Sequence, residues 1–333
     1  MIGRKNVFLS LLVSTVLLSC TKSTKEYPQP NPTTITAPDI FSEIYLTSNS
    51  GIAADYINDI EVNSGMIKIA TANGLSIFDG NNWTTINTTF GLPDNHINCV
   101  QTDGNITWLG TDAGLVKYDG VNITIYNVAN SPIPTNKIRT LLLASDGKLW
   151  IGTFSGGGLA SFDGNNWQVY TPSNSGLPNN SVSVITEANN GSLWIGTASG
   201  VSVFDGNNFV NYHPGNSDLP NALIFDILID NQIIWVASNG GLTKINGSTW
   251  HTYAMQNSGL PLNLVRSLAV ASSSKLCIGM SGQGVVFFNH QTDSWTHYNF
   301  SNSNLSNNYI TTLAIDMLSN KLYIGTENGL NVY

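Results

Sequence analysis

A recurring position in the chain carries side chains that could bind a polar ligand. It is the residue just before an apolar, strand-like segment, and in seven successive repeats it is Tyr56, His96, Lys137, Ser181, Leu223, Leu264 and Tyr309. In a closed ring, the members from repeats seven, one, two and three would be neighbours, and they combine two phenols with an imidazole and an amine. Phe154, Asp112 and Glu327 fall in loops over the same arc. This mixture is typical of a ligand site, although exposed positions also vary without any function.

Two arginines form a second candidate group. Apart from Arg4, Arg139 and Arg266 are the only arginines of the chain, and each directly follows the first apolar residue of its segment. A guanidinium can bind a carboxylate or a phosphate through two hydrogen bonds, so a pair facing one channel would suit an acidic ligand. The alternative is that each arginine pairs with nearby backbone or acidic groups. The predicted ligand-binding residues are Tyr56, His96, Lys137, Arg139, Phe154, Arg266, Tyr309 and Glu327.

The sequence offers little support for catalysis. The five histidines show no metal-ligand spacing, and no G-x-S-x-G motif is present. Aspartates recur at Asp79, Asp119, Asp163 and Asp205, but each begins an Asp-Gly pair that is typical of a tight turn. We therefore predict no metal, no cofactor and no catalytic residue. A lyase or hydrolase that uses His96 with Glu327 stays open as an alternative.

One repeated unit would position all of these residues. A phrase like L-W-I-G-T recurs seven times at intervals of 40 to 46 residues, with its Gly (or Ala) at Ala70, Gly110, Gly152, Gly196, Ala237, Gly279 and Gly325. Repeat three divides into four strand-like segments, which are 137–144, 148–153, 159–162 and 167–170. This period with four short strands per unit indicates a β-propeller. Tryptophans at fixed places in the units are predicted to fill the space between blades.

The ends of the chain are predicted to share one blade. The repeat phase places 42–47 on an outer strand, whereas the last repeat stops after its third strand at 331–333. Pairing the two ends would remove exposed sheet edges. The prediction is an all-β, seven-bladed β-propeller of four-stranded antiparallel blades over 42–333, its ring closed by the N-terminal strand completing blade seven.

The repeats resemble those of the two-component regulator propeller family, through L-W-I-G-T followed by G-L and an aromatic before Asp. The resemblance covers 56–333. It implies an extracytoplasmic ligand-sensing domain, often for polysaccharide signals, attached to a membrane histidine kinase. No kinase or DNA-binding region follows Tyr333 in this sequence, so we expect a stand-alone form that binds a ligand or partner without transmembrane signalling.

The N-terminus predicts export and lipidation. Arg4 and Lys5 precede an apolar run of about a dozen residues, which is too short to span a bilayer and reads as a secretory signal over 1–19. Leu17, Ser19 and Cys20 resemble the bacterial lipoprotein box, so Cys20 is the predicted lipidation site; an ordinary signal peptide is the alternative. Residues 20–41, rich in Pro and Thr, are predicted to be a flexible linker.

Composition limits the partners. The net charge is −8, and only 10% of residues are charged, which argues against nucleic acid and against electrostatic binding to anionic lipid. We expect a monomer in the bacterial cell envelope, held at the outer membrane (periplasmic or surface-exposed) by its lipid anchor alone. The leading hypothesis is non-enzymatic binding of a glycan or protein at the channel mouth. The alternatives are a propeller enzyme acting on a polysaccharide or small molecule, and a structural platform for protein interactions.

Overall fold

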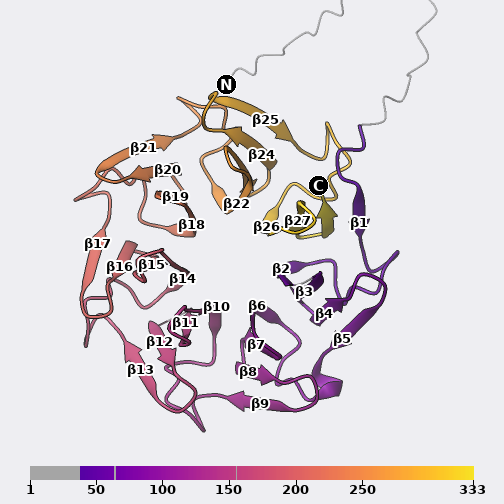
Figure 1. Ribbon diagram of the computed structural model, residues 1–333, viewed down its shortest axis with the longest axis vertical. Coiled ribbons are helices and arrows are strands. Elements are labelled where there is room, and N and C mark those ends of the chain that lie inside the picture. The colour runs from indigo at the N-terminus through magenta and orange to yellow at the C-terminus, as the bar shows by residue number, and fades with distance from the viewer. Residues whose placement is uncertain (1–37, 64, 155) are drawn as a thin grey trace, which may run out of the picture. The chain divides into compact units, whose positions relative to one another are not determined.

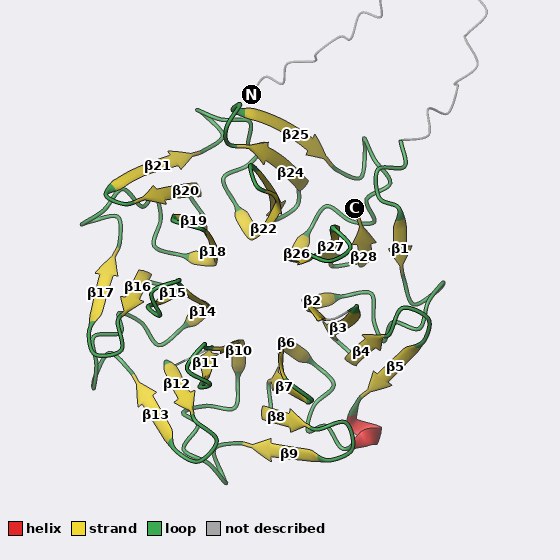
Figure 2. Cartoon of the chain, in the orientation of Figure 1, coloured by secondary structure: helices red, strands yellow, loops and turns green. Residues whose placement is uncertain are grey.

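Seven four-stranded sheets are arranged in a ring in the computed structural model (Figure 1), which describes residues 38–63, 65–154 and 156–333. Consecutive strands within each sheet pair antiparallel, so the predicted seven-bladed β-propeller is confirmed. Among the described residues the only helix is the short 3-10 turn η1 (Thr88–Phe90), shown in red in Figure 2. The predicted signal peptide, Cys20 and most of the predicted linker lie outside the described residues.

Each blade consists of four strands that follow one another from the channel outwards. Blade one holds β2 (Ile57–Asn63), β3 (Met66–Thr71), β4 (Gly74–Phe78) and β5 (Trp83–Ile86), and blade two holds β6 (Ile97–Asp103), β7 (Ile106–Thr111), β8 (Gly114–Tyr118) and β9 (Ile123–Tyr126). Blade three holds β10 (Ile138–Leu143), β11 (Leu149–Thr153), β12 (Leu159–Phe162) and β13 (Trp167–Tyr170), and blade four holds β14 (Val182–Glu187), β15 (Leu193–Thr197), β16 (Gly200–Phe204) and β17 (Phe209–Tyr212). Blade five holds β18 (Ile224–Asp230), β19 (Ile233–Ser238), β20 (Gly241–Asn246) and β21 (Thr249–Tyr253), and blade six holds β22 (Val265–Ser272), β23 (Lys275–Met280), β24 (Gly284–Asn289) and β25 (Ser294–Tyr298). Blade seven holds β26 (Ile310–Asp316), β27 (Lys321–Thr326), β28 (Gly329–Val332) and β1 (Glu43–Tyr45).

The first and last described strands lie side by side in blade seven. β1 pairs antiparallel with β28, with Glu43 opposite Val332 and Tyr45 opposite Leu330. Just before β1, Asn304 accepts hydrogen bonds from the backbone N–H groups of Ile40 and Phe41, and the Phe41 side chain is only 2% exposed. The predicted linker, 20–41, therefore ends in two residues that pack against the propeller.

The repeated Gly of L-W-I-G-T allows neighbouring blades to approach closely. A Cβ on Gly110 would lie 2.7 Å from Ile138 in blade three, and one on Gly325 would lie 2.8 Å from Ile57 in blade one. Those inner Ile side chains are almost fully buried. A small residue is required at this position because the second strand of each blade packs directly on the inner strand of the next.

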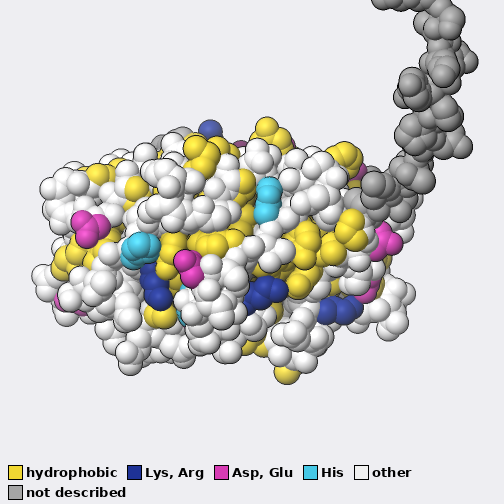
Figure 3. All heavy atoms as spheres, turned by 90° about the horizontal axis from the view of Figure 1, so that it is seen from above, with side chains coloured by type: hydrophobic (Ala, Val, Ile, Leu, Met, Phe, Trp, Pro, Cys, Tyr) yellow, Lys and Arg dark blue, Asp and Glu magenta, His cyan; other side chains and the backbone are white. Residues whose placement is uncertain are grey.

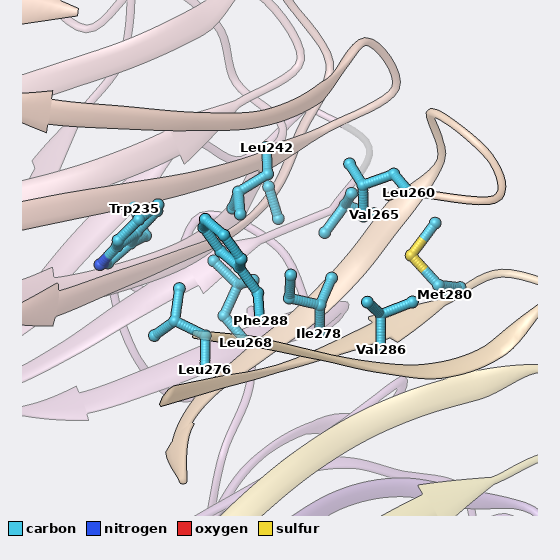
Figure 4. Packing of buried hydrophobic residues seen from close by; sticks show 11 residues of the cluster. Trp235, Leu242, Leu260, Val265, Leu268, Leu276, Ile278, Met280, Val286 and Phe288 are labelled. Carbon is cyan, nitrogen blue, oxygen red and sulfur yellow. The ribbon is translucent and has the colours of Figure 1, made fainter. Parts of the chain in front are cut away.

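The aromatic residues of the repeats form the core between blades, as predicted. In the cluster between blades five and six, Trp235 packs edge-on against Phe288 with its ring centre 6.1 Å away (Figure 4). Phe288 in turn stacks on Trp295 of the outer strand at 3.8 Å. Cys99 and Cys277 are both buried and free.

The repeated aspartates are turn residues, also as predicted. Asp79 accepts hydrogen bonds from the backbone of Asn81 and Asn82, across Gly80 with a φ of 97°. Asp119, Asp163 and Asp205 repeat this geometry. Over the described residues, no group of three His, Cys, Asp or Glu side chains is placed to hold a metal ion.

The described surface is mostly uncharged. Figure 3 shows one side of the propeller, where Lys, Arg, Asp and Glu side chains are scattered among larger uncharged areas. In the part of the chain that the structure describes, no helix is long and apolar enough to cross a bilayer.

Candidate ligand site at the channel mouth

Two sets of loops form the mouth of the channel. The backbone N–H of Phe154, after the second strand of blade three, donates to the carbonyl of Lys137, just before its inner strand. In the same way, the backbone N–H of Glu327 donates to the carbonyl of Tyr309, and the backbone N–H of Ala72 donates to the carbonyl of Tyr56. In each of these blades the hydrogen bond bridges the loop before the inner strand and the loop after the second strand, so both loops lie on one face.

A cavity of about 600 Å³ opens on this face over blades two to six. Its apolar lining includes Phe154, Ala198, Leu223 and Phe225, and its polar lining includes His96, Asn98, Asp112, Ser181, Ser183, Arg139 and Arg266. The volume is in the range of sites for small-molecule ligands. Phe154 and Leu223 are 55% and 40% exposed, so the apolar wall is open to a ligand.

The cavity holds half of the predicted site residues. His96, Arg139, Phe154 and Arg266 line it, whereas Tyr56, Lys137, Tyr309 and Glu327 stand exposed on the rim outside it. The predicted arc covered blades seven, one, two and three. Arc and cavity thus overlap at blades two and three only.

The cavity also contains residues that the sequence did not single out. The site was predicted from polar or aromatic residues at the position just before the inner strand of each blade. Leu223 holds this position in blade five and is neither polar nor aromatic. Phe225 carried a usable signal, because the equivalent channel position in the other blades is polar: Asn58, Asn98, Arg139, Ser183, Arg266 and Thr311. An apolar residue at a position that is polar in the other blades can indicate a ligand site, just as a polar residue among apolar ones can.

Arg139 and Arg266 stand where the mouth cavity meets the channel. Both also line a second, narrower cavity of about 160 Å³, formed by the first residues of the inner strands. Neither guanidinium makes a hydrogen bond or an ion pair with the described residues. Burial lowers the pKa of Arg266, and the positive charge of Arg139 lowers it further, while Tyr56, Asp226 and Glu327 oppose this effect. The two cations therefore lie close enough to repel each other.

Two channel carboxylates near the arginines are held by the backbone. Asp59 accepts hydrogen bonds from the N–H groups of Ile60 and Val100, and Asp226 accepts them from Ile227 and Leu268. Burial raises the pKa of both carboxyls to about 6, although these hydrogen bonds favour the charged form. Each carboxylate thus accepts hydrogen bonds from its own inner strand and from the inner strand of the following blade, and forms no ion pair with an arginine of the described residues.

His96 is held at the edge of the cavity by polar neighbours. Its Nε2 lies 3.3 Å from the Asn58 amide nitrogen, and its Nδ1 lies 4.0 Å from an Asp112 carboxylate oxygen. Asn98 donates to Asp112 and to the carbonyl of Ile138. An acid–base pair at this cavity would therefore be His96 with Asp112, because Glu327 does not line it.

The family model described as two component regulator propeller matches residues 132–155 and 176–199. Over these two segments the chain is similar to two-component regulator propeller repeats. The predicted family resemblance is thereby confirmed, and the two matched repeats supply β10, β11, β14 and β15. They also carry cavity residues from blades three and four, including Arg139, Phe154 and Ala198.

Solved structures share the propeller fold. The extracellular domain of a putative hybrid two component system from B. thetaiotaomicron is 24% identical, with a TM-score of 0.73; the match covers 88% of this chain and 39% of that one. PorZ, a surface component of the type-IX secretion system of Porphyromonas gingivalis, is 17% identical with a TM-score of 0.71, over 85% of this chain and 47% of that one. Virginiamycin B lyase from Staphylococcus aureus is 14% identical with a TM-score of 0.67, over 84% and 94%.

These identities show the fold alone. The chain spans less than half the length of the first two structures. No curated protein sequence matches it. Function must therefore be argued from the cavity itself.

Proposed function

We propose that this propeller is a non-enzymatic binding protein of the bacterial cell envelope, which holds part of a glycan or a protein partner in its mouth cavity. The observation that carries the proposal is the open cavity of about 600 Å³, in which exposed apolar side chains face two arginines without hydrogen-bonding partners among the described residues. Propellers commonly bind ligands where inner strands and loops from several blades converge. The likeness to an extracellular domain supports an extracytoplasmic role.

The test is a binding screen against a glycan array and a panel of small molecules, with a cavity-filling variant. Ala198 is exposed and lines the cavity, so Ala198→Trp should fill the space without disturbing the core. We expect this variant to bind any ligand of the mouth cavity at least tenfold more weakly than the parent. Val121→Trp, at an exposed turn between β8 and β9, is the matched control. A ligand that binds Ala198→Trp as tightly as the parent would contradict the proposal.

The enzyme alternative rests on one observation, the His96–Asp112 pair at the cavity edge. Every ligand found in the screen should be incubated with the protein and analysed for products. Turnover that His96→Gln abolishes would favour a lyase or hydrolase. Binding without product would support the proposed function, and protein partners in place of small ligands would favour the platform.

The proposal includes a lipid anchor at Cys20, which follows from the lipoprotein-box resemblance. In cells, the parent should incorporate labelled palmitate and fractionate with the outer membrane. Cys20→Ser should lose the label and leave the membrane fraction. Label retained by the variant would contradict the anchor but not the binding site.

A further inference from the structure

The donors at the bottom of the mouth cavity are arranged for an anion. Arg139 comes from blade three and Arg266 from blade six, and both line the mouth cavity and the channel below it. Each guanidinium carries five N–H donors, and no described residue accepts a hydrogen bond from either. The nearby carboxylates of Asp59 and Asp226 are already engaged by backbone N–H groups. A bound carboxylate would therefore gain donors that the protein leaves unused.

The wall above these donors is apolar. Phe154, Ala198, Leu223 and Phe225 line it from blades three, four and five. Phe225 also supports the guanidinium of Arg266, whose Cζ lies 5.2 Å from the ring centre. An apolar body resting on this wall would place its charged end beside the arginines.

The same cavity has few groups for the hydroxyls of a neutral sugar. Asn98 already donates to Asp112 and to a backbone carbonyl, and the Ser183 hydroxyl donates to the carbonyl of Ile224. Of the lining hydroxyls, that leaves Ser181, which has no side-chain hydrogen bond within the described residues. The arginine N–H groups could donate to a sugar hydroxyl, but only an anion would make charge-assisted hydrogen bonds with them, which are about twice as strong.

We infer that the mouth cavity binds an amphipathic carboxylate, with an aromatic or branched aliphatic body against Phe154, Leu223 and Phe225 and the carboxylate at the Arg139–Arg266 pair. This inference rests on the proposed function, and names its ligand class. The carboxylate can belong to a free small molecule or to an acidic group of a larger ligand that carries an apolar substituent.

The test uses matched probes. A panel of aryl and branched alkyl carboxylates, each with its uncharged carboxamide, is screened by ligand-observed NMR together with neutral oligosaccharides. We expect the strongest carboxylate to bind at least tenfold more tightly than its carboxamide in titration calorimetry. Arg139→Met and Arg266→Met should each weaken it at least tenfold, because a charge-assisted hydrogen-bond pair is lost.

Matched variants separate charge, geometry and folding. Lys148→Met removes one positive charge from an exposed pair with Asp146 on the opposite face and should leave affinity unchanged. Arg266→Lys keeps the charge but loses the planar fork and should bind the carboxylate less tightly than the parent. Thermal unfolding shows whether each variant is folded. If Arg266→Met fails to fold, the affinities of Arg139→Met and Arg266→Lys for the carboxylate test the inference.

The outcomes distinguish the two proposals. Carboxamides or neutral oligosaccharides that bind as tightly as carboxylates, and that Ala198→Trp excludes, would overturn the anionic ligand class while the mouth site stands. Carboxylate binding that neither arginine variant weakens would also overturn the inference. If no probe binds at the mouth, the inference fails, and an empty glycan array would then count against the proposed function as well.

Discussion

The guanidinium carbon of Arg266 lies 5.2 Å from the centre of the Phe225 ring, across the boundary between blades five and six. A guanidinium held over an aromatic face keeps its in-plane N–H donors available. Phe225 thereby holds Arg266 at the junction of the mouth cavity and the channel, where a carboxylate could reach it.

Phe225→Ala should weaken carboxylate binding about fivefold, because Arg266 loses its support and the cavity loses part of its apolar wall. Titration calorimetry with the strongest carboxylate of the panel measures the change. Phe300→Ala, which truncates a phenylalanine that is 66% exposed, is the control. Equal affinity in parent and Phe225→Ala would show that the ring does not position the arginine.

Carboxylate binding should strengthen as the pH falls from 8 to 5.5. Asp59 and Asp226 have pKa values of about 6, so their negative charges near the arginines disappear over this range, while a probe with a pKa of about 4 stays ionised. Besides the two arginines, the titratable or charged groups that act on these carboxyls or on Arg266 include Tyr56, Glu61, Cys99 and Glu327.

Asp226→Asn should flatten this pH dependence, which binding titrations at several pH values will reveal. The uncharged carboxamide serves as the control, since its affinity should not follow the charge of the channel. Carboxylate affinity that rises with pH would contradict the assignment of the arginines as the anion site.

The same carboxyls should make the fold less stable as the pH rises from 4 to 6. Their pKa is about 6 in the folded protein, compared with 3.8 without the fold. Between these values the folded state holds protons that the unfolded chain has released, so the free energy of unfolding falls as the pH rises, by at most about 3 kcal/mol per group. Denaturant unfolding of Asp226→Asn should show a shallower fall. Asp39→Asn, at an exposed position, should behave as the parent.

Gly325→Ala should destabilise the contact between blades seven and one. The new Cβ would lie 2.6 Å from Thr312 and 2.8 Å from Ile57, so the two inner strands would have to separate. We expect a loss of about 1 to 3 kcal/mol in the free energy of unfolding. Ala70→Gly, at the equivalent position of blade one, should cost less than about 1 kcal/mol. Unchanged stability of Gly325→Ala would mean that the blades can move apart freely.

Phe41→Ala should loosen the N-terminal edge of blade seven. The Phe41 ring is buried against Tyr298 and Tyr333, with ring centres 6.4 and 6.2 Å away. Its removal should cost about 3 kcal/mol and speed proteolysis ahead of β1, which mass spectrometry of limited digests would detect. Phe300→Ala is again the exposed control. Equal digestion rates would show that β1 is held without Phe41.

The repeat explains why so much of the fold could be predicted. Strand order, turn aspartates and interblade tryptophans follow from residues that recur at fixed intervals, since each blade solves the same packing problem. The approach of Gly325 to Ile57 repeats that of Gly110 to Ile138. Even the pairing of β1 with β28 was predictable, because the last repeat lacks its fourth strand.

The lining of the mouth cavity was only half predictable, because a cavity depends on how side chains from several blades leave space between them. Tyr56 and Tyr309 differ from the repeat as much as His96 does, yet they stand outside the cavity. Leu223 differs in no way that suggests binding, but it forms part of the wall. Residue type at one position does not reveal whether its neighbours on adjacent blades are large enough to close the space beside it.

By itself, the sequence determined the seven blades, their register and the placement of two arginines at the channel, because strand period and turn residues act locally. The tertiary structure decided that Arg139 and Arg266 have no acidic partner among the described residues, that Asp59 and Asp226 bind backbone N–H groups, and that the open wall lies over blades three to five. Those outcomes depend on distances across the ring, which arise only when all the blades pack around one channel.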